Sequence, residues 1–283
     1  MLREKLSHIE REEGRALYKD RDLVKHDLDK IISLTLRRCV DGDWDEDFIT
    51  RSMLSNIRDC FSEIHLIKDQ EMGRPSVCQI QAYKNRKVDN YEPDYGDIGI
   101  IVRLNLGKGK ILEGVALLEA KRIYTPDENI DDVPSPIFKA LKFDQLSKHT
   151  ANTSNHRTVL YDFHDKGLRR VYSVKTLPSQ HMLVANVKDR SIYPLTEDFS
   201  YSLVHRYMCG YELNYETEII EGFKGNTTKE AAKRYLLELD FCSEEDFDKG
   251  NDSIGKNINS DMYRPLDPGF LEADGWYPKR KVA

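Results

Sequence analysis

Apolar residues recur at helical intervals through the first sixty or so positions of the chain. In residues 1–40 they lie three or four positions apart, with a break near Gly14, and this spacing predicts one or two amphipathic helices. The same spacing runs from Phe48 to Phe61 and predicts another helix. We expect residues 1–42 to form a helical arm that either packs on the rest of the protein or docks a partner.

The pattern then changes to that of β-strands. Runs rich in apolar and β-branched residues predict strands over 76–83, 97–104, 110–121, 158–163, 170–175 and 182–187. Gly107-Lys108-Gly109, between the second and third of these, is a strong hairpin signal. A helix is expected near 137–149, and residues 196–283 are expected to be mostly helical and irregular.

Together these elements predict an α/β protein with a mixed central sheet flanked by helices. We expect three parts. The helical arm covers 1–42, the core covers 43–200, and a C-terminal helical and irregular extension at 201–283 packs on the core. The length of 283 residues suits one large domain or two small ones.

Composition limits the class of protein and the compartment in which it is expected to work. The chain has no run of about 18 apolar residues, which argues against a membrane span, and its start lacks the apolar stretch of a secretory leader. Its five Cys are scattered and include no C-x-x-C pair. This argues against a disulfide framework or a zinc ribbon and favours a reducing cytoplasm.

The net charge of −6, taken alone, argues against a nucleic-acid-binding protein. The acids are unevenly distributed, however, because the window from Lys84 to Lys188 is net basic and the acid excess lies outside it. A nucleic-acid surface is therefore expected in this window. The chain is not expected to hold DNA strongly without a partner or a second copy.

The feature with chemical content is Glu119-Ala120-Lys121, at the end of the third predicted strand. It closes the apolar run from Val115 to Leu118. A buried strand has no reason to carry Glu and Lys side by side unless their charges are paired or bind something. A structural ion-pair cluster is the alternative to a functional site here.

The hairpin supplies a geometric test of this feature. If the turn centres on Lys108, cross-strand partners have numbers that sum to 216, so position 119 faces Asp97. Two facing carboxylates repel unless a cation lies between them. Asp94 would face a position beyond the end of the hairpin, so we prefer Asp97 as the metal-binding acid. A slip of one residue would undo this argument.

These motifs resemble those of the PD-(D/E)xK nuclease superfamily, which includes restriction endonucleases. The resemblance rests on Gly96-Asp97-Ile98-Gly99, on Leu118-Glu119-Ala120-Lys121-Arg122, and on the order of elements from about 44 to 163. It covers less than half of the chain. It implies a restriction-endonuclease-like fold and metal-dependent hydrolysis of phosphodiester bonds.

The resemblance also implies roles for these residues. Asp97 and Glu119, with the backbone carbonyl of Ala120, would hold Mg²⁺ or Mn²⁺ through oxygen ligands. The metal would polarise the phosphate and activate a water molecule. Lys121 would position that water or neutralise the phosphate.

Further candidates lie on the flanking helices. Gln145, on the helix after the Lys-bearing strand, matches a Gln that orients the active site in some branches, and otherwise is a surface residue. Glu46 matches a first-helix carboxylate that adds a metal ligand, and otherwise is an acid favoured by the helix dipole. His149 stands where one branch carries Tyr, and the segment from His149 to His156 is expected to be a polar loop.

The implied function is that of a DNA endonuclease that acts as effector of an antiphage defence complex. RNA as substrate and a non-catalytic scaffold subunit with the same fold remain alternatives. A protein partner or a second copy is expected to bind through the N-terminal helices. The candidate phosphate contacts are Lys84, Arg86, Lys87, Arg122, Arg169 and Arg170.

Overall fold

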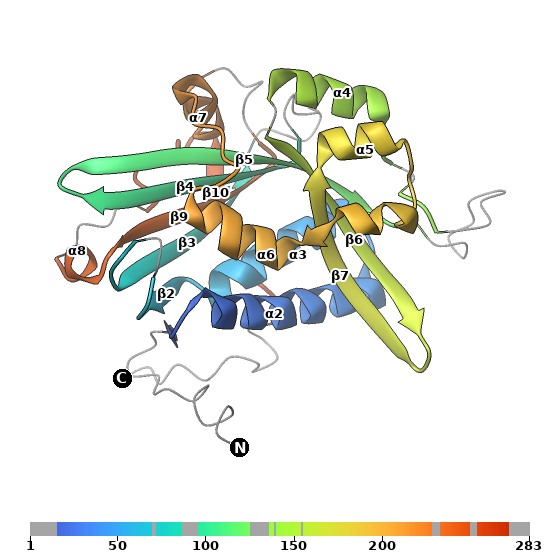
Figure 1. Cartoon of the computed structure of the whole chain (residues 1–283), viewed down its shortest axis with the longest axis horizontal. Coiled ribbons are helices and arrows are strands. Elements are labelled where there is room, and N and C mark those ends of the chain that lie inside the picture. Colours follow the sequence, from blue (N-terminus) through green and yellow to red (C-terminus); the bar gives the residue numbers. More distant parts are fainter. Residues whose placement is uncertain are drawn as a thin grey trace.

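The computed structural model describes residues 16–69, 72–86, 96–124, 136–138, 140–153, 155–227, 233–249 and 254–271. Its centre is a ten-stranded mixed sheet with helices on both faces (Figure 1). This confirms the predicted α/β class. The strands in spatial order are β1 (Ala16–Tyr18), β2 (Glu63–Leu66), β3 (Ser76–Asn85), β9 (Tyr235–Ser243), β4 (Ile98–Gly107), β5 (Lys110–Arg122), β6 (His156–Lys166), β7 (Arg169–Pro178) and β8 (Glu197–Asp198), and β10 (Tyr263–Pro265) pairs with β3.

The strand at the middle of the sheet, β9, comes from late in the chain. It pairs in parallel with β4 and antiparallel with β3, and all nine of its residues are buried. The expectation that 196–283 is mostly helical and irregular was therefore wrong for this strand. The sheet draws on residues from both sides of the expected boundary at residue 200.

The helices divide between the two faces of the sheet. Figure 1 shows α2 (Arg21–Gly42) and α3 (Glu46–Cys60) below the sheet, and α4 (Phe143–Asn152), α5 (Ser179–Ala185) and α7 (Thr217–Phe223) above it. Successive side chains of a strand point to opposite faces. Accordingly Ile98 and Leu118 pack with α2 and α3, whereas Leu117 packs with α7. The shorter segments are η1 (Arg190–Leu195), α6 (Phe199–Tyr201), η2 (Ser202–Arg206), η3 (Tyr207–Cys209) and α8 (Glu244–Asp248).

The long N-terminal helix α2 is part of the main core. Asp20 caps it by accepting a hydrogen bond from Leu23 N at 3.3 Å, and its apolar stripe, including Val24, Leu28 and Leu36, is buried against the sheet. The apolar face of this helix is therefore used within the fold. The break expected near Gly14, and the apolar positions before it, lie outside the described residues.

The β4–β5 hairpin has the expected turn and register. Lys108 and Gly109 both have positive φ, 53° and 74°, as a two-residue type I′ turn requires. Ile98 pairs with Leu118 and Asn105 with Ile111, so the paired numbers sum to 216 along this stretch, with an irregularity only next to the turn. The predicted register is thus confirmed.

Two expected elements differ in the structure. Residues 182–187 do not form a strand: Ser179–Ala185 is the helix α5, which ends at Asn186 in the left-handed conformation with φ 52°. The apolar run there is too short for periodicity to separate helix from strand. The helix expected at 137–149 begins later, at Phe143.

Candidate active site at the edge of the sheet

The candidate residues meet where β4 begins and β5 ends. Asp97 lies directly before β4, and its Oδ2 accepts a hydrogen bond from the backbone N–H of Ala120 at 3.2 Å. This contact ties the start of one strand to the end of its neighbour. It fixes the Asp97 carboxylate beside the strand that carries Glu119 and Lys121.

The ammonium group of Lys121 lies among three carboxylates. Its Nζ is 2.5 Å from Glu119 Oε1, 3.5 Å from Glu46 Oε1 and 3.9 Å from Asp97 Oδ2. The side chains of Lys121 and Glu119 are 7% and 1% exposed. Charges buried to this degree need partners, and here they provide them for one another.

Glu46 reaches this cluster from the first turn of α3. Asp45 caps the helix by accepting hydrogen bonds from the N–H groups of Asp47 and Phe48 at 2.9 and 3.2 Å. The loop before it is fixed by Trp44, whose indole N–H donates to the carbonyl of Ile123 at 2.9 Å. The structure therefore brings Glu46 together with Asp97, Glu119 and Lys121.

The electrostatics of the cluster follow from its burial. Burial raises the pKa of the Glu119 carboxyl to about 8, the charge of Asp97 adds to this effect, and Lys121 opposes it. Burial likewise raises the pKa of Glu46 to about 7 against the opposing charge of Lys121. For Lys121 burial acts in the opposite direction, but the three carboxylates outweigh it and raise its pKa above the ordinary value.

Two histidines lie near Glu119 on regular elements, so the expectation of a polar loop from His149 to His156 was wrong for both of them. His149 is on α4, with its Nε2 3.7 Å from Glu119 Oε2, and His156 begins β6. Their rings stack with centroids 4.8 Å apart, and both residues are almost fully buried. His156 Nδ1 lies 2.8 Å from Ser179 Oγ. The one available signal was the place of His149 one helical turn after Gln145.

Gln145 itself is half-buried on α4. Within the described residues it forms no hydrogen bond to Glu119 or Lys121, and the side chain of this helix that approaches the cluster is His149. Among the described residues, this helix therefore reaches the site through His149, and Gln145 forms no hydrogen bond to the cluster.

The donor set suits a hard cation. Both Glu119 oxygens are shielded from solvent, and neither accepts a hydrogen bond of regular geometry from the described residues. Carboxylate oxygens are the ligands that Mg²⁺ and Mn²⁺ prefer. Within the described ranges, however, no three His, Cys, Asp or Glu side chains are arranged as a preformed metal site. The cation among the carboxylates is the Lys121 ammonium, and Ala120 contributes its N–H to Asp97.

The candidate phosphate contacts fall into two groups. Lys84, Arg86 and Arg122 lie at the ends of β3 and β5, on the same edge as the cluster. Lys84 Nζ is 3.8 Å from Asp47 Oδ2, and Arg122 stacks on Tyr124 at 3.8 Å. Lys87 and the alternative acid Asp94 lie outside the described residues.

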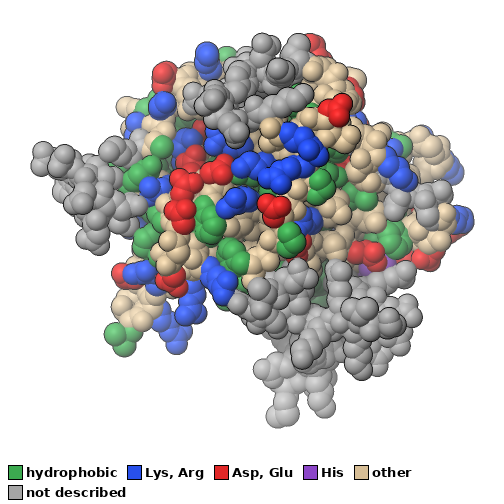
Figure 2. Space-filling view, turned by 180° about the vertical axis from the view of Figure 1, so that it is seen from behind, with side chains coloured by type: hydrophobic (Ala, Val, Ile, Leu, Met, Phe, Trp, Pro, Cys, Tyr) green, Lys and Arg blue, Asp and Glu red, His purple; other side chains and the backbone are tan. Residues whose placement is uncertain are grey.

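Arg169 and Arg170 instead lie at the β6–β7 turn, where Arg170 Nε pairs with Asp165 at 3.1 Å. β5 pairs with β6 only as far as Tyr161, so this turn lies about five residues, or about 16 Å, beyond that contact. On the face turned away from the viewer of Figure 1, Lys and Arg side chains gather beside Asp and Glu side chains (Figure 2).

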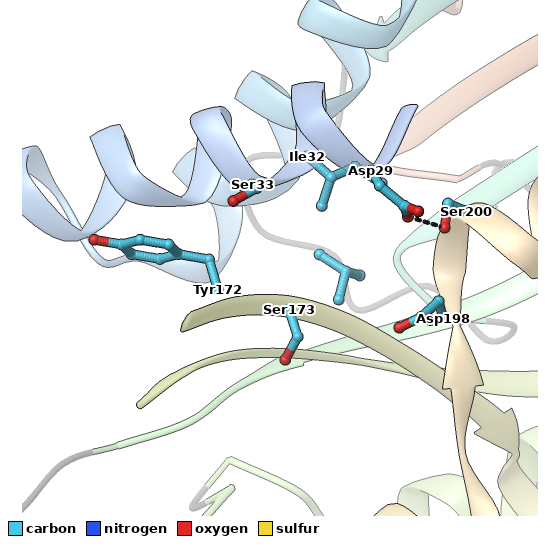
Figure 3. Close-up of a pocket in the computed structure, with 8 residues that line it drawn as sticks. Asp29, Ile32, Ser33, Tyr172, Ser173, Asp198 and Ser200 are labelled. Carbon is cyan, nitrogen blue, oxygen red and sulfur yellow. Dashed lines mark hydrogen bonds between the residues drawn. The ribbon is translucent and has the colours of Figure 1, made fainter. Parts of the chain in front are cut away.

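A cavity of about 280 Å³ lies elsewhere, between α2 and β7 (Figure 3). Ser200 donates a hydrogen bond to Asp29 at its wall, and Asp198 lies nearby. Each carboxylate is already paired with a Lys, Lys25 for Asp29 and Lys175 for Asp198. The cavity shares no residue with the cluster.

Comparisons with protein-family models, with curated proteins and with solved structures find no match to this chain. No helix in the described part of the chain is long and apolar enough to cross a membrane. The five Cys all lie within the described residues and form no disulfide.

Proposed function

We propose that this protein is a metal-dependent nuclease of the PD-(D/E)xK type, with a restriction-endonuclease-like core, that hydrolyses phosphodiester bonds in DNA. The observation that carries the proposal is the meeting of Asp97, Glu119 and Lys121 at one edge of the sheet, with Glu46 as a fourth member. Acidic and basic side chains that are buried together at the edge of a sheet are typical of functional sites, where pKa values are perturbed.

Asp97 and Glu119 would hold Mg²⁺ or Mn²⁺, with Glu46 as a further oxygen ligand and the Ala120 carbonyl as a backbone ligand. When bound, the ion supplies a Lewis acid for the phosphate and lowers the pKa of an attacking water. The Ala120 N–H keeps the Asp97 carboxylate in place. Lys121 would turn from the carboxylates to the phosphate and neutralise its charge, and Gln145 would orient the water or Lys121.

The direct test is cleavage of supercoiled plasmid DNA with Mg²⁺ or Mn²⁺, and with EDTA as the metal-free reference. We expect nicking or linearisation by the wild type and none by Glu119→Gln or Lys121→Met. Glu113→Gln is the matched control, because Glu113 lies on the same strand and forms an ion pair with Lys224 away from the cluster. Equal cleavage by the wild type and the Glu119 variant would overturn the site assignment.

A scaffold subunit without catalysis is favoured by one observation, the position of the Lys121 ammonium among the carboxylates. Such a cluster is electrostatically satisfied without a metal. The two functions differ in their response to divalent cations, because a scaffold would neither be stabilised by Mn²⁺ nor cleave nucleic acid. Cleavage of RNA in place of DNA, tested with the same variants, identifies a ribonuclease.

The cellular role that we propose is that of an effector in antiphage defence, working in the cytoplasm with a protein partner or a second copy. Its support is the resemblance of the motifs, together with five Cys that form no disulfide. Because α2 buries its apolar stripe in the core, only the solvent-facing side of α2 is open, within the described residues, for the partner contact proposed for the N-terminal helices.

A further inference from the structure

β9 brings a basic residue to the candidate site from far along the chain. Tyr235 N–H donates to the carbonyl of Asp97 at 3.1 Å, so Arg234 lies beside Asp97 at the same edge of the sheet. The guanidinium Nη1 of Arg234 is 3.5 Å from Asp47 Oδ1. Arg234 was not among the residues that the sequence singled out.

Asp47 lies between two cations. One of its oxygens faces Arg234, and the other faces Lys84 Nζ at 3.8 Å. The three side chains are 35%, 26% and 36% exposed for Arg234, Lys84 and Asp47. The Asp47 carboxylate, which is partly open to solvent, therefore lies between two basic side chains next to the acidic cluster.

These two ion pairs are loose. Their separations of 3.5 and 3.8 Å are longer than that of a close pair such as Lys224 with Glu113, at 2.8 Å. The Nε of Arg234 is also buried and has no hydrogen-bond partner among the described residues. An incoming phosphate would meet the exposed part of this guanidinium, and a turn of the side chain toward the phosphate would free the Nε–H for a second, parallel hydrogen bond.

We propose that Arg234 and Lys84 bind a backbone phosphate of the DNA next to the scissile one, and that Asp47 is an internal counter-anion which this phosphate displaces. The proposal rests on the proposed function for the choice of DNA as ligand. A phosphate carries more acceptor oxygens than a carboxylate and meets both cations at once. Asp47 thereby lowers the affinity of the free protein for nucleic acid.

The test is binding of a fluorescein-labelled duplex DNA to the full-length protein, measured by anisotropy in EDTA so that no metal-dependent cleavage occurs. We expect Arg234→Ala to weaken binding about tenfold or more. It should also reduce the slope of log K against log salt by about 0.9, the value for one phosphate contact. Asp47→Asn should bind the duplex more tightly than the wild type.

Asp47→Asn keeps the test independent of misfolding, because a damaged protein does not gain affinity. Lys249→Ala and Glu245→Gln are the matched controls. Glu245 in α8 and Lys249 directly after it form an exposed ion pair at 2.6 Å, and α8 follows the opposite end of β9. Their variants should bind as the wild type does. Unchanged binding by Arg234→Ala, or no gain by Asp47→Asn, overturns the inference.

Cleavage of plasmid by the same proteins separates this inference from the proposed function. If the wild type cleaves DNA and both Arg234→Ala and Asp47→Asn bind the duplex as the wild type does, the phosphate site is refuted and the nuclease function stands. If the wild type binds DNA through Arg234 but cleaves neither DNA nor RNA, the nuclease function is refuted and the phosphate site stands. A wild type that does not bind the duplex overturns the phosphate site itself.

Discussion

Lys121 Nζ lies 2.5 Å from Glu119 Oε1, and the two residues are second neighbours on one face of β5. The contact is buried, so removal of either side chain leaves the other without its nearest partner. The ammonium group also takes the position among Asp97, Glu46 and Glu119 that a divalent cation would need. A structural ion pair and a metal-binding site therefore compete for the same carboxylates, and variants at Lys121 and Glu119 separate them.

Removal of the Lys121 charge should convert the cluster into a better cation site. We expect Lys121→Met to lower the free energy of unfolding by about 3 kcal/mol in EDTA, because it leaves buried carboxylates without their cation. Saturating Mn²⁺ should restore much of this loss. Urea unfolding with and without Mn²⁺ measures both effects.

The control for this prediction is Lys224→Met. Lys224 is also 7% exposed and lies 2.8 and 2.9 Å from the carboxylates of Glu113 and Glu221, which are more open to solvent. Its variant should be destabilised without a comparable gain from Mn²⁺. An equal response of both variants to the metal would show that the cluster has no particular affinity for divalent cations.

The raised pKa of Glu119 predicts how stability depends on pH. With an ordinary value of 4.5 and a folded value of about 8, the folded protein keeps a proton that the unfolded chain releases. The contribution of this group to the free energy of unfolding is therefore constant below pH 4.5 and declines as the pH rises to about 8.

Glu119→Gln cannot release this proton, so its stability relative to the wild type should rise with pH across that window. Urea unfolding at a series of pH values measures the difference, with Glu113→Gln, on the same strand, as the control that should follow the wild type. Parallel curves for Glu119→Gln and the wild type would contradict a raised pKa at this position.

His149 should support Glu119 through its ring nitrogen. We expect His149→Phe to keep the stack on His156, and with it the stability, but to lose the polar contact to Glu119. Residues that orient a metal ligand typically affect metal affinity or activity by about 10–100-fold, and we expect a loss of that order in cleavage. The measurements are the cleavage rate and the Mn²⁺ concentration that gives half of it.

His205→Phe is the matched control for this variant. Its imidazole also has an aromatic neighbour, Tyr201 at 4.9 Å, and a carboxylate, Asp22 at 3.2 Å, but it lies near the surface away from the cluster. Both variants should have similar thermal midpoints. Cleavage by His149→Phe at the rate of His205→Phe would exclude a supporting role for His149.

The parts of the site that the sequence predicted depend on local pairing. Lys108 and Gly109 determine the turn, and the turn determines the register, which pairs Ile98 with Leu118 and, one residue further, sets Asp97 against position 119. Each step involves residues close in sequence, so periodicity and turn chemistry were sufficient.

The parts that the sequence did not predict depend on contacts between distant segments. β9 is buried on both faces, yet it carries Glu238, which accepts hydrogen bonds from Tyr83 and from Gly255 N, both at 2.9 Å. Glu238 interrupts an apolar run, and its partners lie far away in the sequence. The sequence pattern therefore did not identify this segment as a buried strand. The position of Arg234 beside Asp97 follows from β9 and was hidden with it. His149 reaches Glu119 only through the packing of α4 on the sheet.

The last prediction concerns the glycine that precedes Asp97. Gly96 has φ +92°, and a Cβ at this position would lie 2.6 Å from the backbone oxygen of Leu118 and 3.1 Å from His156 Nε2. A backbone atom cannot move aside as a flexible side chain would. Gly96→Ala should therefore shift the start of β4 away from the end of β5. This shift should weaken the hydrogen bond that Ala120 N–H donates to the Asp97 carboxylate.

We expect Gly96→Ala to lower the free energy of unfolding by more than about 1–2 kcal/mol, which is the cost of an unfavourable positive φ alone. The variant should also fail to cleave DNA. Gly73→Ala isolates that cost, since Gly73 has φ +65° and a Cβ there would meet nothing within 4 Å. Urea unfolding and plasmid cleavage of the two variants measure the difference. If Gly96→Ala were no less stable than Gly73→Ala and cleaved DNA normally, then close apposition of the two strands would not be what holds Asp97 in the site.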